Sequence, residues 1–200
     1  MNAFAHNANQ LELLKNIRER MNDDTLLFCT TSQANMILNG EFDTIYHEHL
    51  SFFCANSMNE LAKRAGLNLI DICKTPIHGT SYIFVLSPTQ GNPYRISNLL
   101  EFERAAGLMN RTCYRSWVEK VNFTVNQFAN MCEVFDRQRG YLLIGYGAAA
   151  KGNTLLNFSK VHLSMIIDDN PLKQGLFSPG RHIPVVSINE LDNIDHNQPI

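Results

Sequence analysis

Two histidines, a glutamate and a tyrosine stand together in the segment FDTIYHEHLSFF. If the segment is extended, His47 and His49 face one side, and Tyr46 and Glu48 face the other. Three interpretations stay open. Histidine is the side chain most often used for proton transfer near neutral pH, so His49 suits a general base that Glu48 or Tyr46 assists. His-x-His with a carboxylate could instead ligate a metal, with His78 as a further ligand. An ordinary polar loop is the third interpretation.

A second group lies in the glycine-rich sequence GYGAAAKG, between a strand-like run and a helical one. Gly145, Gly147 and Ala150 satisfy the relaxed G-x-G-x-x-A pattern, in which glycines permit a tight turn and the following helix N-terminus offers N–H groups to phosphate. Lys151 adds a cation in the first helical turn. Asp168 and Asp169 end the next strand, about 20 residues on, where a ribose-binding acid would lie.

This glycine-rich sequence favours a phosphate or nucleotide ligand, although small residues also let a helix and a strand pack closely. NAD is less favoured than another phosphorylated ligand, because Lys151 and Lys173 add more positive charge than a dinucleotide site needs.

A third group, in PIHGTS, is predicted to lie at a hairpin tip. His78, Thr80 and Ser81 offer hydrogen-bond donors beside Gly79, where a ligand can approach the backbone. Taken alone, the sequence is typical of a turn.

The elements that must position these groups alternate between helix and strand. NAFAH resembles the tail of a strand. Apolar residues recur from Leu11 to Met21 with helical spacing, and TLLFCTT is typical of a strand covered on both faces. Ser57 is a candidate N-cap with Glu60 in a capping box, and Gly66 is a candidate helix stop. NLIDICKTPI and TSYIFVLSP then predict an antiparallel hairpin.

The turn-rich sequence PTQGNP marks a domain boundary near residue 88. Helical patterns follow over residues 96–139, where Gly107 is expected to separate two helices. An apolar stripe from Val118 to Phe135 predicts a buried helix face. YLLIGYG, AAAKGNTLLNF and LSMIIDD then predict a βαβ unit with buried, parallel strands. RHIPVVS is a candidate third strand and INELDN a short helix.

Composition describes a globular chain of 200 residues, with 44% hydrophobic and 18% charged residues. The net charge of −2 gives no electrostatic case for nucleic acid or an anionic membrane as partner. No apolar run approaches the roughly 20 residues that a membrane span needs, and the N-terminus lacks a signal-peptide pattern. Five cysteines without a C-x-x-C pair indicate neither a disulfide framework nor a zinc knuckle, so a reducing cytoplasm is expected.

Three stretches together, FDTIYHEHLSFF, HGTS and GYGAAAKGNTLLNF…IIDDNPLKQGLFSPGRHIPV, resemble the sugar C-methyltransferases that act on nucleotide-linked keto-deoxy sugars in deoxysugar biosynthesis. The match runs in order over nearly the whole chain. It implies an α/β fold in which residues 1–88 form the second half of a Rossmann-like methyltransferase sheet. Residues 89–200 would form a smaller Rossmann-like α/β domain that opens with long helices.

The resemblance implies that His49 is the general base, with Glu48 and Tyr46 assisting, and that the segment holds no metal. Methylating a carbon beside a ketone requires removal of a weakly acidic C–H, and a nearby O–H or N–H can stabilise the enolate that results. HGTS corresponds to a stretch that the family usually has as H-G-G-S. The substrate-binding residues implied for a dTDP-type sugar are His78, Gly79, Ser81, Gly145, Gly147, Lys151 and Asn153.

The cofactor implied is S-adenosylmethionine (SAM). The family's glycine-rich SAM loop and zinc cysteines have no counterpart in this sequence, so we expect an incomplete SAM site. The chain is therefore expected to be a SAM-dependent C-methyltransferase. Alternatively, it is a non-catalytic nucleotide-sugar-binding module, or a split subunit whose partner chain supplies the SAM half. Half of such a sheet exposes an apolar edge, which favours the last two, and we expect no methyl transfer from the isolated chain.

Overall fold

The structure is a computed structural model that describes residues 3–31, 35–76, 81–138, 141–194 and 199. Its contacts divide the chain into two compact units. Unit 1 comprises Met1–Phe42 and His47–Trp117, and unit 2 comprises Asp43–Tyr46 and Val118–Ile200. Each unit is described by itself below.

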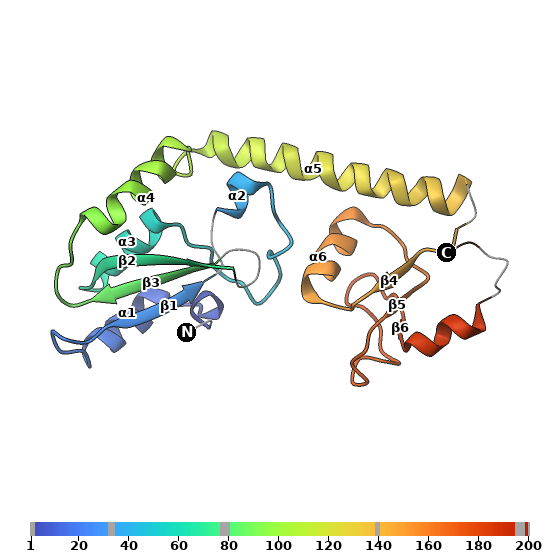
Figure 1. The fold of residues 1–200 in the computed structure, drawn as a ribbon, viewed down its shortest axis with the longest axis horizontal. Coiled ribbons are helices and arrows are strands. Elements are labelled where there is room, and N and C mark those ends of the chain that lie inside the picture. The colour runs from blue at the N-terminus through green and yellow to red at the C-terminus, as the bar shows by residue number, and fades with distance from the viewer. Residues whose placement is uncertain (1–2, 32–34, 77–80, 139–140, 195–198, 200) are drawn as a thin grey trace. The chain divides into compact units, whose positions relative to one another are not determined.

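Unit 1 is built on a three-stranded sheet in the order β1-β3-β2, with β3 antiparallel to both neighbours (Figure 1). The strands are β1 (Leu27–Thr31), β2 (Asn68–Thr75) and β3 (Ser81–Ser87). The expected antiparallel pairing of β2 with β3 is confirmed, and their connection lies outside the described residues.

The expectation that β1 is covered on both faces is wrong. Cys29 and Thr31 are buried, whereas the Phe28 side chain between them is 53% exposed. This alternation is typical of a sheet with one packed face. On that face, burial raises the pKa of the Cys29 thiol to about 11, so the thiol stays protonated and acts as a small apolar side chain.

The core of unit 1 lies between this face and the helices. Tyr82, Phe84 and Leu86, alternate residues of β3, pack with Leu14 and Met58 from two different helices. The NAFAH sequence, expected to be the tail of a strand, contains a 3-10 helix instead. The helices before the domain boundary are η1 (Phe4–His6), α1 (Gln10–Arg18), α2 (Met36–Asn39) and α3 (Ala55–Arg64).

Helix α3 begins three residues earlier than its sequence signals predict. Cys54 is the N-cap, its sulfur accepts the Ser57 N–H at 3.4 Å, and the Ser57 hydroxyl accepts the Cys54 N–H at 3.0 Å. Ser57 is therefore the third helical residue of the capping box. Gly66 has a φ of 74° directly after the helix, which confirms it as the stop.

Two long helices follow, α4 (Tyr94–Ala105) and α5 (Arg111–Glu133), and Gly107 separates them with a φ of 81°. A π-helical turn, Val134–Gln138, extends α5. Val121, Val125 and Cys132 are buried, as the apolar stripe predicts, but Val118 is 46% exposed. The two compact units divide within α5, between Trp117 and Val118. The domain boundary near residue 88 is a separate feature and stays a prediction.

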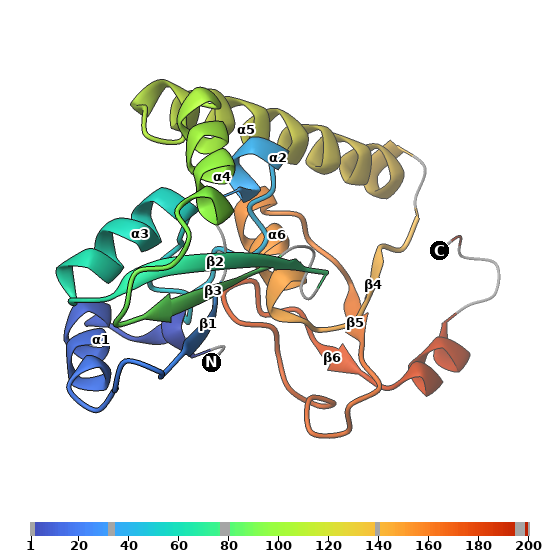
Figure 2. The same cartoon turned by 60° about the vertical axis from the view of Figure 1, so that its left-hand side comes forward.

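Unit 2 contains a parallel sheet in the order β4-β5-β6 (Figure 2). The predicted βαβ unit is confirmed by β4 and β5 with α6 between them, but β4 is shorter and more exposed than expected, since Tyr146 is 69% exposed. The elements are β4 (Ile144–Tyr146), α6 (Ala150–Ser159), β5 (Met165–Ile167), β6 (Val185–Val186) and η3 (Ile188–Asn193).

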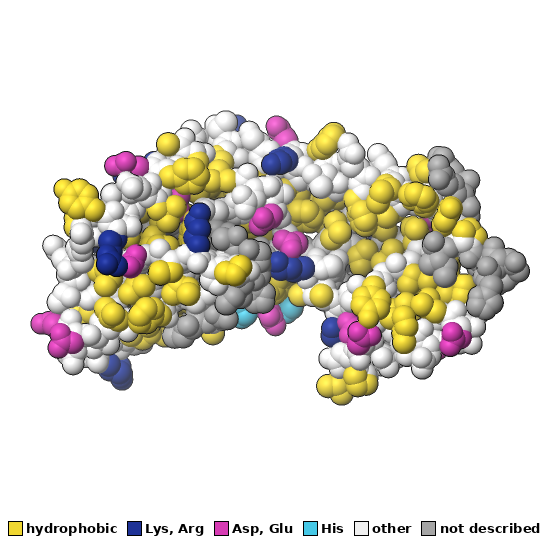
Figure 3. Space-filling model, viewed as in Figure 1, with side chains coloured by type: hydrophobic (Ala, Val, Ile, Leu, Met, Phe, Trp, Pro, Cys, Tyr) yellow, Lys and Arg dark blue, Asp and Glu magenta, His cyan; other side chains and the backbone are white. Residues whose placement is uncertain are grey.

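Hydrophobic side chains reach the surface of both units and are interspersed with charged ones (Figure 3). None of the helices in the described part of the chain is long and apolar enough to span a membrane.

A buried carboxylate joins α3 to α4 within unit 1. Glu103 of α4 is fully buried, and its two oxygens accept the N–H groups of Ala55 at 2.7 Å and Asn56 at 2.9 Å. The Asn56 side chain donates a third bond at 2.9 Å. The carboxylate thus satisfies otherwise unpaired donors at a helix N-terminus, where the helix dipole favours negative charge.

Replacing Glu103 with Gln should lower the free energy of unfolding by about 3 kcal/mol. The Gln side chain has the same size but no charge, and its NH₂ group would face N–H donors in place of an accepting oxygen. Urea denaturation measures this. Glu101→Gln, an exposed change on the same helix, should stay within about 0.5 kcal/mol of the parent. Equal midpoints for the two variants would contradict a structural role of the buried carboxylate.

Candidate functional site

The segment that carries the candidate base is not extended. It forms turns at Asp43–Thr44 and His47–Glu48, so the strand alternation of its side chains does not apply. The His47 side chain is 89% exposed, and its Nε2 lies 4.0 Å from Glu48 Oε1, which is itself well exposed. At this distance and exposure, the pair gives little orientation to either group.

His49 occupies a more enclosed position than its neighbours and is half-buried. The His49 and His6 ring centroids lie 5.1 Å apart, and the Phe52 ring meets the His49 ring edge-on at 5.9 Å. Two rings from different parts of unit 1 therefore limit the orientations of the His49 imidazole.

The 3-10 helix η1 fixes this segment to the core of unit 1. The Leu50 N–H donates to the Ala5 carbonyl at 3.0 Å, and the Phe53 and Phe4 ring centroids lie 5.3 Å apart. Phe4 and Ala5 are almost completely buried. Sequence reasoning missed His6, the next residue, because its segment was interpreted as a strand.

The remaining residues predicted beside the base are only partly described. Tyr46 is half-buried. It follows the turn at Asp43–Thr44, and its N–H donates to the Thr44 carbonyl at 3.1 Å. Ser81 is buried at the start of β3. His78 and Gly79 lie outside the described residues.

In unit 2, the glycine-rich sequence has the predicted strand–turn–helix context. Gly147 has a φ of 89°, and its N–H donates to the Ile167 carbonyl of β5 at 2.7 Å. Helix α6 then begins without a side-chain N-cap bond. Gly145 has a packing role, since a Cβ there would lie 2.9 Å from Leu163 Cδ1.

A cavity of about 250 Å³ lies beside this turn. Gly147, Gly152 and Asn153 line it from the turn and the first part of α6, while Leu176 and Phe177 line it from the segment after β5. Asn153 Oδ1 is buried and has no hydrogen-bond partner in the structure. The cavity is thus mainly apolar, with a helix N-terminus and an unpaired amide oxygen at its edge.

Asp168, at the position expected for a ribose-binding acid, bonds in the structure to the protein's own backbone and to Lys173. Its Oδ2 accepts the Ala148 N–H at 2.7 Å and the Lys173 ammonium at 2.8 Å, and its Oδ1 accepts the Asn170 N–H at 2.9 Å. The Lys173 hydrogen bond, with those from Asn170 and Ala148, lowers the pKa of the Asp168 carboxyl below its usual range. The acid therefore holds the glycine-rich turn in place.

Asp169, the next residue, accepts the Tyr146 hydroxyl at 2.7 Å, which raises the pKa of that phenol. Lys151, predicted to meet the substrate, lies 3.2 Å from Asp43 Oδ2.

Comparison with known proteins gives a family match for each of two parts of the chain. Residues 76–199, more than half of the chain, match the family described as the C-methyltransferase C-terminal domain. The chain belongs to this C-methyltransferase family. Residues 1–72 match a methyltransferase domain, so the expected Rossmann-like α/β methyltransferase fold is confirmed.

C-methyltransferase NovU of Streptomyces niveus is 29% identical over 194 residues. The alignment covers 92% of this chain but only 45% of NovU. This C-methyltransferase family member thus spans less than half the length of its relative.

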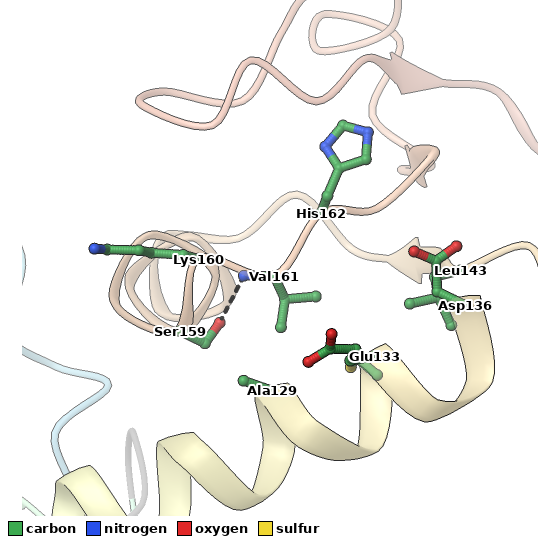
Figure 4. Close-up of a pocket in the computed structure, with 9 residues that line it drawn as sticks. Ala129, Glu133, Asp136, Leu143, Ser159, Lys160, Val161 and His162 are labelled. Atoms are coloured by element: carbon green, nitrogen blue, oxygen red, sulfur yellow. Dashed lines mark hydrogen bonds between the residues drawn. The ribbon is translucent and has the colours of Figure 1, made fainter. Parts of the chain in front are cut away.

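A second cavity of about 250 Å³ lies at the other end of the parallel sheet (Figure 4). Glu133 and Asp136 line it from the end of α5 and its π-helical turn, and Lys160 and His162 line it from the connection before β5. Ligands of open α/β sheets bind at the carboxyl ends of strands, which favours the cavity beside Gly147 in this member of the family. Within the described residues, no group of three His, Cys, Asp or Glu side chains is placed to hold a metal ion.

Replacing Lys173 with Met should remove the largest cause of the lowered Asp168 pKa. A lowered folded-state pKa stabilises the protein above the ordinary pKa of about 4, and this stabilisation is lost as the pH falls through the lowered value. The Tm difference between parent and variant should therefore be constant above about pH 5 and shrink below about pH 4. Thermal unfolding from pH 7 to pH 3 measures it.

Lys120→Met on α5, where the lysine is exposed, is the matched control and should show no pH-dependent Tm difference. A Lys173→Met difference that persists unchanged to pH 3 would contradict the role of the Lys173–Asp168 pair.

Proposed function

We propose that this chain is a SAM-dependent C-methyltransferase, or part of one, that acts on a dTDP-type, nucleotide-linked keto-deoxy sugar, with His49 as general base. The family match and the NovU relative support this reaction class. The observation that carries the assignment of the base is the half-buried His49 imidazole, which packs against the His6 and Phe52 rings.

The chemistry assigned to His49 is removal of a proton from the carbon beside the sugar ketone. A base with restricted ring orientations loses less rotational freedom when it meets that C–H. Glu48 and Tyr46 assist in this proposal, with the Tyr46 hydroxyl as a donor to the enolate oxygen. His6, adjacent in space, is a further polar group within the same site.

The nucleotide is assigned to the cavity beside the glycine-rich turn. Its apolar walls suit a planar base, and the uncapped N-terminus of α6 suits phosphate. Asn153 offers an unpaired acceptor for an N–H of the base or a hydroxyl of the sugar. The residues that we assign to the nucleotide sugar are His78, Gly79, Ser81, Gly145, Gly147, Lys151 and Asn153.

The described part of unit 1 does not fit a SAM site. Its glycines with positive φ are Gly40, Gly66 and Gly107, and each one follows a helix. None of these three positive-φ glycines lies in a turn that leads from a strand into a helix N-terminus, the arrangement that binds a cofactor through backbone N–H groups. The reaction proposed for this chain's own residues is therefore the proton transfer.

Replacing His49 with Asn should slow proton abstraction by at least about 100-fold. The measurement is wash-in of deuterium at the carbon beside the ketone of a dTDP-4-keto-6-deoxy sugar in D₂O, followed by NMR. This readout needs no methyl donor, so it tests the base directly.

His47→Asn is the matched control, because His47 is largely in solvent two residues away. It should exchange at the parental rate. Parental exchange by His49→Asn, or equal losses in both variants, would rule out His49 as the base.

A second candidate function is a nucleotide-sugar-binding subunit or module in the cytoplasm, completed by a partner chain that supplies the SAM half. The exposed apolar side of unit 1 favours it, since Leu26 and Phe28, at the start of the sheet, are 48% and 53% exposed. Apolar surface of this kind is typically covered by another protein segment.

Calorimetric titrations of the purified chain with SAM and with dTDP distinguish the two candidates. If the chain is a binding subunit, dTDP should bind and SAM should not, because the turn at Gly147, which leads from β4 into the N-terminus of α6, lies in unit 2. Saturable binding of SAM by the chain alone would contradict the second candidate and favour a complete enzyme.

A further inference from the structure

Lys151 and Asp43 form an ion pair that connects two segments implicated in the proposed function. Lys151 Nζ lies 3.2 Å from Asp43 Oδ2, and the two side chains are 37% and 40% exposed. Lys151 is in the first turn of α6, and Asp43 lies three residues before Tyr46. Both residues belong to unit 2.

The ion pair holds a short turn against α6. The chain contributes Asp43–Tyr46 to unit 2, and the Tyr46 N–H meets the Thr44 carbonyl at 3.1 Å within this turn. Asp43 is therefore attached through Lys151 to the helix whose N-terminus we assign to the nucleotide. The position of Tyr46 depends on the same turn.

We propose that Lys151 exchanges partners: it pairs with Asp43 in the structure, and it moves to the diphosphate when a nucleotide binds, which releases the turn that carries Tyr46. This inference rests on the proposed binding of a nucleotide sugar at α6. The lysine side chain suits such an exchange, because its ammonium is a point charge on a flexible four-carbon stem.

The second lysine near the cavity is less able to exchange. Lys173 donates to Asp168, whose side chain is only 9% exposed, and to the Ala148 carbonyl at 3.0 Å. Removing Lys173 would leave a nearly buried carboxylate without its cation, which is unfavourable. Asp43 is accessible to water, so it can be solvated when Lys151 leaves.

Because two anions compete for Lys151, substitution of Asp43 should change nucleotide affinity in the opposite direction to substitution of a residue that binds the nucleotide. The Asp43 carboxylate opposes the diphosphate, both by holding Lys151 and by its own negative charge. Removing that charge should strengthen nucleotide binding.

Calorimetric titration of the full chain with dTDP at low ionic strength tests the exchange. Asp43→Asn should tighten the dTDP Kd by about two- to fivefold, the size expected for loss of an exposed ion pair. Lys151→Met should weaken it by about tenfold or more, because a hydrogen bond to a charged group is lost. The controls Asp192→Asn and Lys120→Met remove one exposed charge each from unit 2 and should leave Kd unchanged.

Hydrogen exchange gives an independent readout. Saturating dTDP should speed exchange at Tyr46 in the parent, whereas Asp43→Asn should exchange rapidly at this position with or without dTDP. Because both side chains of the pair are partly exposed, the variants should fold with nearly parental Tm.

The outcomes separate this inference from the proposed function. If the parent binds dTDP but Asp43→Asn binds equally or more weakly, or Lys151→Met binds as well as the parent, the exchange is wrong and nucleotide binding stands. If neither the parent nor Asp43→Asn binds dTDP, both proposals fail. Binding by Asp43→Asn alone would support the exchange in its strongest form.

Discussion

The buried Glu103 carboxylate is the contact on which the arrangement of unit 1 most depends. A carboxylate is tolerated in an apolar interior only when its oxygens are satisfied, and here the donors belong to the N-terminus of α3. Helix α3 starts two residues after Phe53, at the end of the segment that carries the candidate base. Glu103 therefore fixes the end of that segment. The Ala5 carbonyl, which accepts the Leu50 N–H, fixes the part of the segment around Leu50. An irregular segment gains a defined position from its two neighbours.

Unit 2 also contains an acidic side chain that accepts backbone N–H groups, but this one connects two turns. Asp168 also satisfies backbone N–H groups, but its donors lie in the turns after two parallel strands, at Ala148 and Asn170. The acid connects the carboxyl ends of β4 and β5, where an α/β sheet binds its ligands. Its spacing from the glycine turn is that of a ribose-binding acid, yet its oxygens are engaged by the protein. In the proposed binding mode, the helix terminus and the cavity walls are therefore the groups available to a nucleotide.

Sequence patterns predicted the features that depend on residues close together in the chain. The parallel βαβ unit, the antiparallel pairing of β2 with β3, and the glycine stops at Gly66 and Gly107 follow from periodicity and backbone preference. Long-range contacts were missed. Nothing near Glu103 indicates that it reaches a residue 48 positions away. The contact of His6 in η1 with His49 likewise joins residues far apart in the sequence. Cys54 was missed as a cap because Ser57 is the more usual N-cap residue type.

Charge near α6 is balanced, which limits how an anion can bind there. Lys173 faces Asp168 and Lys151 faces Asp43, so each cation already has a carboxylate at hydrogen-bond or ion-pair distance. A lysine that bound a diphosphate at α6 would therefore have to share its ammonium with this carboxylate or leave it. The two lysines are similarly exposed, at 39% and 37%, but the carboxylates are not, at 9% and 40%. Since an exposed carboxylate is more easily solvated than a nearly buried one, we expect the pair with Asp43 to be the one that yields.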